Sequence, residues 1–149
     1  MSDLDELYQQ IIVEHNRSPR NFRRLEHPTR TAAGNNPLCG DTITVDVALE
    51  GDVIADVAFE GKGCAISKAS ASLMTDAVKG KPVKDAEAMF AAFRGMLSGG
   101  ANAPGKLAAF SGVRAFPSRI KCANLAWHAL HAALQNSAEP VTTESAKDF

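Results

Sequence analysis

Three cysteines and one aspartate are the residues of this sequence best suited to metal or sulfur chemistry. Cys39 and Asp41 lie two positions apart in "NPLCGD", whereas Cys64 follows Cys39 by 25 positions and Cys122 follows Cys64 by 58. Three thiolates and one carboxylate make a four-ligand set that suits zinc, or iron in an iron–sulfur cluster. The spacings are too long for a zinc ribbon, so buried cysteines and an ordinary turn aspartate remain an open alternative.

The surroundings of Cys64 and Cys122 favour ionised thiols. Cys64 follows "EGKG" and directly precedes an expected helix, and Cys122 lies within the first turns of another. Helix N-termini carry unpaired N–H groups and partial positive charge, which stabilise a thiolate relative to a thiol. Gly61 and Gly63 remove side chains around Cys64, which allows another group to approach it closely.

Hydrophobic periodicity predicts an α+β fold, in which a small three-stranded antiparallel sheet has helices packed mainly on one face. Apolar residues recur at helical spacing in four segments: residues 3–16, 66–80, 83–97 and 117–135. Alternating apolar residues predict two strands and a short hairpin loop, with a third strand before them: about 29–35, 43–49 and 53–59. Residues 106–115 are expected to form a short helix or a turn.

Composition predicts one cytoplasmic domain over residues 1–149, with residues 137–149 as a disordered tail. The chain has 149 residues, is 45% hydrophobic and carries a formal net charge of −1, so no overall basic character points to nucleic acid. An odd count of three cysteines argues against a secreted disulfide scaffold. No stretch approaches the roughly 20 apolar residues of a membrane span, so no membrane partner is expected.

The basic run "RSPRNFRR" permits two interpretations. It contains Arg17, Arg20, Arg23 and Arg24. Charge clusters usually form solvated surfaces, so a solvated turn is the simpler interpretation. A docking patch for an acidic partner is the alternative.

Three segments resemble the cysteine motifs of the IscU/SufU (NifU N-terminal-like) family of iron–sulfur cluster assembly proteins. They are "NPLCGD", "GKGCAISKASASLM" and "FPSRIKCANLAW", and the resemblance runs from the first helix to about residue 135. The chain looks most similar to the SufU type, because Lys121 stands where IscU-type scaffolds carry a histidine before the third cysteine. The region 83–115 would contain the SufU-type insertion, and "FPSRIK" replaces the chaperone motif of the IscU type.

This resemblance implies a zinc site and a sulfur-transfer activity. Proteins of the SufU type bind one zinc through residues that correspond here to Cys39, Asp41, Cys64 and Cys122. They accept persulfide sulfur from a SufS-type cysteine desulfurase and pass it toward downstream iron–sulfur assembly proteins. The family fold is α+β, with helices on one side of a small antiparallel sheet.

Within that implied site, we expect Cys39 to be the sulfur acceptor, because its loop next to Gly40 is less constrained than a helix. A ligand supplied by the desulfurase would free it for thiol–disulfide-type exchange. Asp41 either keeps the site exchangeable or only fixes its geometry. Four cations near the cysteines in sequence could offset the anionic ligands: Lys62, Lys68, Arg119 and Lys121. The alternative for the lysines is that they are ordinary surface residues that serve solubility.

Two other functions remain open on the same ligands. One is a scaffold that assembles a transient [2Fe–2S] cluster, with iron in place of zinc. The other is a zinc-stabilised interaction module without transfer chemistry.

Overall fold

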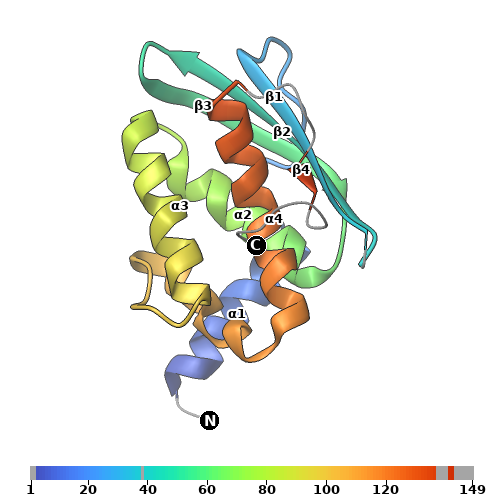
Figure 1. The fold of residues 1–149 in the computed structure, drawn as a ribbon, viewed down its shortest axis with the longest axis vertical. Coiled ribbons are helices and arrows are strands. Elements are labelled where there is room, and N and C mark those ends of the chain that lie inside the picture. The colour runs from blue at the N-terminus through green and yellow to red at the C-terminus, as the bar shows by residue number, and fades with distance from the viewer. Residues whose placement is uncertain (1–2, 38, 137–140, 143–149) are drawn as a thin grey trace.

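The fold is α+β, as the sequence predicts. The computed structural model describes residues 3–37, 39–136 and 141–142. Its elements are α1 (Asp3–Arg17), β1 (Arg30–Asn36), β2 (Asp41–Glu50), β3 (Val53–Lys62), α2 (Ala65–Val78), α3 (Val83–Leu97), the 3₁₀ helix η1 (Gly105–Ala115), α4 (Pro117–Leu134) and β4 (Val141–Thr142). Figure 1 shows the helices gathered on one side of the sheet.

The sheet has the strand order β3-β2-β1-β4. The two longest strands, β2 and β3, form an antiparallel hairpin, and β1 pairs antiparallel with the other edge of β2. These are the three strands that the sequence predicts, and the alternating pattern indicates two of them, β2 and β3. The short strand β4 adds a parallel pairing to β1 that the sequence pattern did not indicate.

Strand β4 falls inside the segment expected to be a disordered tail. Val141 and Thr142 pair with Gly34 and Asn35 near the end of β1, so these two residues are ordered against the sheet edge. Both are β-branched and suit a strand, but a two-residue pairing is too short to leave an alternating pattern. The rest of the expected tail lies outside the described residues.

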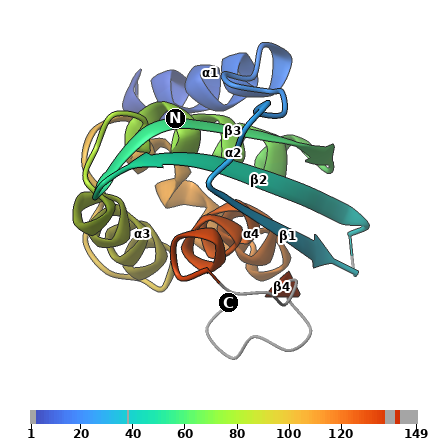
Figure 2. The same cartoon turned by 90° about the horizontal axis from the view of Figure 1, so that it is seen from above.

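Helix α4 is the central helix of the molecule. It packs between the sheet and the other helices, as Figure 2 shows from above, and six consecutive residues from Cys122 to Trp127 are buried. Phe93 of α3 stacks on Trp127 with ring centroids 5.1 Å apart. Phe110 of η1 meets the ring of Phe93 edge-on at 5.6 Å. A cysteine in the first turns of this helix is therefore enclosed by the core.

Small residues allow α2 to lie close to α4. Four consecutive positions of α2, from Ala69 to Ser72, are Ala or Ser, and all of them are buried. The hydroxyl of Ser70 donates to the main-chain carbonyl of Ala123 at 2.6 Å. The "KASAS" segment thus brings the start of α2 next to the start of α4.

Across the described residues, none of the helices combines the length and the apolar character needed to cross a membrane.

The arginines between α1 and β1 are engaged in ion pairs within the chain. Arg20 pairs with Glu14 at 2.8 Å, and Arg23 pairs with Asp56 at 2.9 Å. Arg24 pairs with the buried Asp46 of β2 at 2.7 Å. Arg23 and Arg24 therefore fasten the α1–β1 connection to the sheet, while the three paired arginine side chains stay 38–47% exposed, which agrees with a solvated turn. A docking patch for an acidic partner stays a prediction.

Asp46 of β2 binds the α1–β1 connection through several hydrogen bonds. Its carboxylate is buried and accepts two bonds from Arg24, at 2.7 and 3.1 Å, one from the Leu25 N–H at 3.0 Å and one from the Thr31 hydroxyl at 2.7 Å. Burial acts to raise the pKa of Asp46, but the hydrogen bonds from Arg24, Thr31 and Leu25 outweigh it and hold the pKa below the ordinary value.

We predict that Asp46→Ala lowers the free energy of unfolding by about 2–4 kcal/mol at neutral pH, because the donors around the carboxylate lose their acceptor. The folded state holds the pKa of Asp46 below its unfolded value, so the stabilisation is complete above the ordinary pKa of 3.8 and is lost as the pH falls through the lowered value. Urea unfolding at several pH values should show the difference between the two proteins shrinking in acid. The matched control is Asp56→Ala, which removes a partly exposed carboxylate and should cost about 1 kcal/mol or less; equal losses would contradict the prediction.

Candidate metal centre

Cys39, Asp41 and Cys122 come together at one end of the sheet. One candidate ligand atom from each lies within 4.8 Å of the other two, and the Sγ atoms of Cys122 and Cys39 are 3.6 Å apart. Cys39 belongs to the β1–β2 turn, Asp41 is the first residue of β2, and Cys122 lies in the second turn of α4. The fold therefore joins residues that are 83 positions apart in the chain.

The turn between β1 and β2 presents Cys39 to solvent. The main-chain N–H of Cys39 donates to the carbonyl of Asn36 at 3.2 Å, which closes the turn. Gly40 then takes a φ of 71°, a left-handed conformation that glycine adopts without a steric penalty. The chain reverses within a few residues as a result, and the exposed Cys39 stands next to the buried Asp41.

Asp41 is a buried carboxylate with an incomplete set of partners. Its side chain is 1% exposed, and its Oδ1 accepts the main-chain N–H of Cys64 at 3.0 Å. Its Oδ2 is buried and has no hydrogen-bond partner among the described residues. A buried carboxylate oxygen without a partner is costly unless a cation or a donor binds it. This atom therefore marks a position suited to a cation.

Gly63 gives Asp41 the room that it occupies. A Cβ atom at Gly63 would lie 2.8 Å from Oδ1 of Asp41 and 3.2 Å from the Cβ of Ser67. Contacts below 3.0 Å force a shift of the neighbouring atom. The glycine that the sequence places before Cys64 is thus explained by the close approach of a carboxylate.

Cys64 lies beside the cluster of Cys39, Asp41 and Cys122, although the group of mutually close ligand atoms does not include it. It is the N-cap of α2, and its Sγ accepts the main-chain N–H of Ser67 at 3.5 Å. A hydrogen bond from the Cys122 thiol, helped by main-chain N–H groups at the start of α2, lowers the pKa of Cys64 to about 6 despite partial burial. The expectation of a thiolate at this helix N-terminus agrees with this environment.

For Cys122 the expectation of an ionised thiol is wrong. The side chain is fully buried, and donation to Cys64 together with burial raises the pKa of its thiol far above the ordinary value. The side-chain amide of Asn36 donates a hydrogen bond to Cys122 Sγ at 3.6 Å. Proximity to the Cys122 sulfur and to the other cysteines raises the pKa of Arg119. Of the cations expected near the site, Arg119 is the one that the pKa shifts place beside the cluster.

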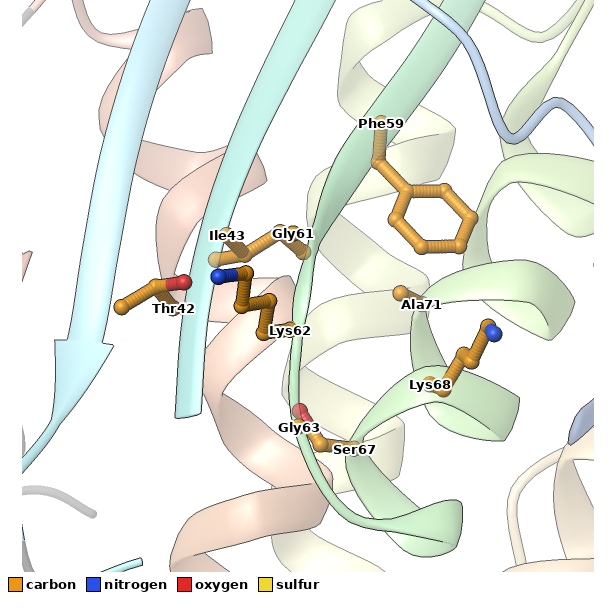
Figure 3. A pocket seen from close by; sticks show the side chains of 9 residues that line it. All are labelled: Thr42, Ile43, Phe59, Gly61, Lys62, Gly63, Ser67, Lys68 and Ala71. Atoms are coloured by element: carbon orange, nitrogen blue, oxygen red, sulfur yellow. The ribbon is translucent and has the colours of Figure 1, made fainter. Parts of the chain in front are cut away.

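The two lysines on the other side of the site have different surroundings. Figure 3 shows a small pocket between the end of β3 and the start of α2. The Lys62 side chain extends over β2 toward Thr42, whereas the Lys68 side chain points away from β2. The Lys68 ammonium lies 5.0 Å from the centre of the Phe22 ring, a cation–π contact. Lys68 is therefore held by an aromatic ring outside the cluster.

Asn36 is the site residue that the sequence interpretation missed. It stands three positions before Cys39 in "NNPLC", where its carbonyl closes the turn and its side chain reaches α4. Asparagine is common in turns for local reasons, so its presence alone gave no sign of a contact with Cys122.

These features define an α+β protein with a sulfur-rich candidate metal centre at the end of its sheet. Residues 7–142 match the family described as NifU-like N terminal domain, and the chain belongs to this family. The family resemblance expected from the three cysteine motifs is thereby confirmed.

Individual relatives carry both of the names that the motifs suggested. The chain is 44% identical over 133 residues to the zinc-dependent sulfurtransferase SufU of Bacillus subtilis, with 87% of this chain and 90% of the relative covered. It is 39% identical over 154 residues to the iron–sulfur cluster assembly scaffold protein IscU of Streptococcus pyogenes, with 99% and 96% covered. The crystal structure of a SufU from Fervidobacterium islandicum, described as a putative iron–sulfur cluster assembly scaffold protein, superposes with a TM-score of 0.81 at 33% identity, covering 87% of this chain and 97% of that one. The chain is therefore part of an iron–sulfur cluster assembly family, whichever type it represents.

We predict that the three cysteines of the reduced, metal-free protein react with iodoacetamide in an order set by their environments. Cys39 and Cys64 should react well before Cys122, which is buried and has a raised pKa. The pKa of Cys64 is lowered to about 6, so its thiolate is present above that pH and its reaction rate should level off near pH 7, where an ordinary thiol is still mostly protonated.

Peptide mass spectrometry after short exposures at a series of pH values measures these rates. In urea-unfolded protein the three cysteines should react alike, which is the control. Modification of Cys122 first in the folded protein would show that the described arrangement is wrong.

Proposed function

We propose that the protein is a SufU-type sulfur-transfer protein that binds zinc through Cys39, Asp41, Cys64 and Cys122. It takes persulfide sulfur from a SufS-type cysteine desulfurase and passes it to downstream iron–sulfur assembly proteins. The observation that carries this proposal is the buried Asp41 carboxylate, which has an unpartnered oxygen and clusters with two thiols. The similarity to the zinc-dependent sulfurtransferase of Bacillus subtilis supports it.

The donor set fits zinc. Two sulfur atoms and a carboxylate already lie within 4.8 Å of one another, and Cys64 stands next to them with a thiol that ionises readily. Zinc has no redox chemistry, and when bound it would keep these thiols ionised and stabilise the ends of β2, α2 and α4 against one another. Arg119 supplies positive charge beside an otherwise anionic site.

Cys39 is the residue suited to accept sulfur, because it is exposed whereas Cys122 is buried. Its thiolate attacks the outer sulfur of the desulfurase persulfide, and a new sulfur–sulfur bond forms at Cys39 Sγ. The sulfur–sulfur bond of the donor breaks, and the desulfurase cysteine leaves as a thiolate. The exchange conserves charge and electrons, so it needs no added oxidant or reductant.

A scaffold for a transient [2Fe–2S] cluster is the second candidate function, because the Streptococcus pyogenes relative is a scaffold protein and the same four residues would serve as ligands. Lys121 argues for transfer, since it directly precedes Cys122 where the resemblance places a histidine in IscU-type scaffolds. An interaction module that holds zinc without any chemistry is the third candidate.

Metal analysis of protein purified without air should separate these candidates. For the transfer protein we expect about one zinc per chain, no visible chromophore and stimulation of a cysteine desulfurase. A brown protein with labile sulfide would favour the scaffold, and zinc without stimulation would favour the inert module. Lys106→Ala, an exposed change in η1 away from the site, is the control and should leave metal content and stimulation unchanged.

Substitution of single cysteines tests which residue receives the sulfur. With radiolabelled cysteine and the desulfurase, we expect Cys39→Ser to abolish sulfur uptake, because it removes the exposed nucleophile. Cys122→Ser should weaken metal binding and leave some label on Cys39. Mass spectrometry of the Cys39 peptide should show the added mass of one sulfur atom. Uptake that survives the loss of Cys39 but not the loss of Cys122 would reverse the assignment.

A further inference from the structure

We propose that Asn36 is a positioning residue that keeps Cys122 in the ligand set while Cys39 is free to react. This inference rests on the proposed function and adds a residue to its site. Asn36 contacts both cysteines with different groups: its side-chain amide donates to Cys122 Sγ at 3.6 Å, and its main-chain carbonyl accepts the N–H of Cys39 at 3.2 Å.

The position of Asn36 in the fold makes this double contact possible. It is the last residue of β1 and stands opposite Asp41 in the antiparallel register, so it lies at the strand end that carries the site. Its side chain is 1% exposed and reaches from the sheet to the first turns of α4. A buried amide N–H needs an acceptor, because leaving it unpaired costs about 1–3 kcal/mol. The Cys122 sulfur is an acceptor that the fold places within reach of this amide.

A hydrogen bond from an amide changes the chemistry of a sulfur ligand. The N–H withdraws electron density from the thiolate and stabilises its negative charge, so the sulfur is a weaker nucleophile and stays in a fixed orientation. Cys122 has this bond and is buried, whereas the sulfur of Cys39 is exposed at the turn. The two thiols that lie side by side thus have separate tasks: Cys122 is retained and Cys39 exchanges.

The contact of Asn36 with Cys122 can be separated by mutation from its contact with Cys39. A side-chain substitution removes the N–H that binds Cys122, but it leaves the main-chain carbonyl that closes the Cys39 turn. The effect of such a substitution should therefore appear at Cys122 and at the metal, and not in the reactivity of Cys39.

The test uses the full chain loaded with cobalt(II) or zinc. Asn36→Leu keeps the branched shape of the side chain without a donor, and Asn36→Ala removes the donor with a smaller side chain. For both we expect zinc affinity, measured by chelator competition, to fall about 10–100-fold. The thiolate-to-cobalt charge-transfer band should move to lower energy, because the sulfur regains electron density. Alkylation of Cys39 in the metal-free protein should stay within about twofold of the unaltered chain, as expected if the main-chain bond is kept.

Asn124→Leu is the matched control. Asn124 is also a buried amide, at 1% exposure, and it lies on α4 two positions after Cys122, which is about 200° around the helix. The Asn124→Leu substitution should leave both the thiolate-to-cobalt band and the zinc affinity unchanged. Equal changes in Asn124→Leu and the Asn36 variants would overturn the proposal, since they would reflect a general loss of packing. If the larger leucine prevents folding, the alanine variant decides the question.

Failure of the role proposed for Asn36 can be distinguished from failure of the proposed sulfur transfer. If the unaltered chain binds cobalt through thiolates but takes up no sulfur from a desulfurase, sulfur transfer is wrong and the role of Asn36 in holding Cys122 stands. If the chain takes up sulfur and the Asn36 variants show an unchanged band and an unchanged affinity, the role of Asn36 is overturned and the proposed function stands.

Discussion

The burial of the Asp41 carboxylate is the constraint on which the site depends. One oxygen binds the N–H of Cys64 at the start of α2, and Gly63 has no side chain because that oxygen needs the space. The other oxygen has no partner among the described residues. Burying such a group costs free energy that the protein alone does not recover, so a bound cation at this point would stabilise the fold as well as the site.

The arrangement of helices decides how the three thiols differ. Helix α4 is enclosed by the sheet and by α2, so Cys122 in its early turns has no access to solvent. The small residues of α2 allow Cys64, the N-cap of α2, to approach α4. There the hydrogen bond from the Cys122 thiol lowers the pKa of Cys64 to about 6. Cys39 lies in the β1–β2 turn, where its side chain is exposed. The cluster therefore contains a buried and an exposed thiol, and the thiol of Cys64 beside it is of intermediate exposure.

Local patterns in the sequence were sufficient for most of the fold but not for the site. Alternating valines predicted β2 and β3, and the glycines before Cys64 predicted a close approach at the start of α2, because these features follow from short-range periodicity and backbone freedom. Strand β4 was missed because two residues leave no period. The meeting of Cys39 with Cys122 depends on tertiary packing, so only the family motifs indicated it. The contact of Asn36 with Cys122 crosses from the sheet to α4, and no local pattern records such a contact.

The difference between a transfer protein and a scaffold is a difference in how firmly each ligand is held. A scaffold must keep its ligands together while a cluster forms, whereas transfer needs one sulfur that can leave and return. In this chain the buried sulfur is bound by the Asn36 amide and lies next to Arg119, while the exposed sulfur sits on a turn that Gly40 allows to reverse sharply. Such a gradient of restraint across neighbouring sulfurs suits the exchange proposed at Cys39, because that thiol is exposed while Asp41 and Cys122 are buried in the fold.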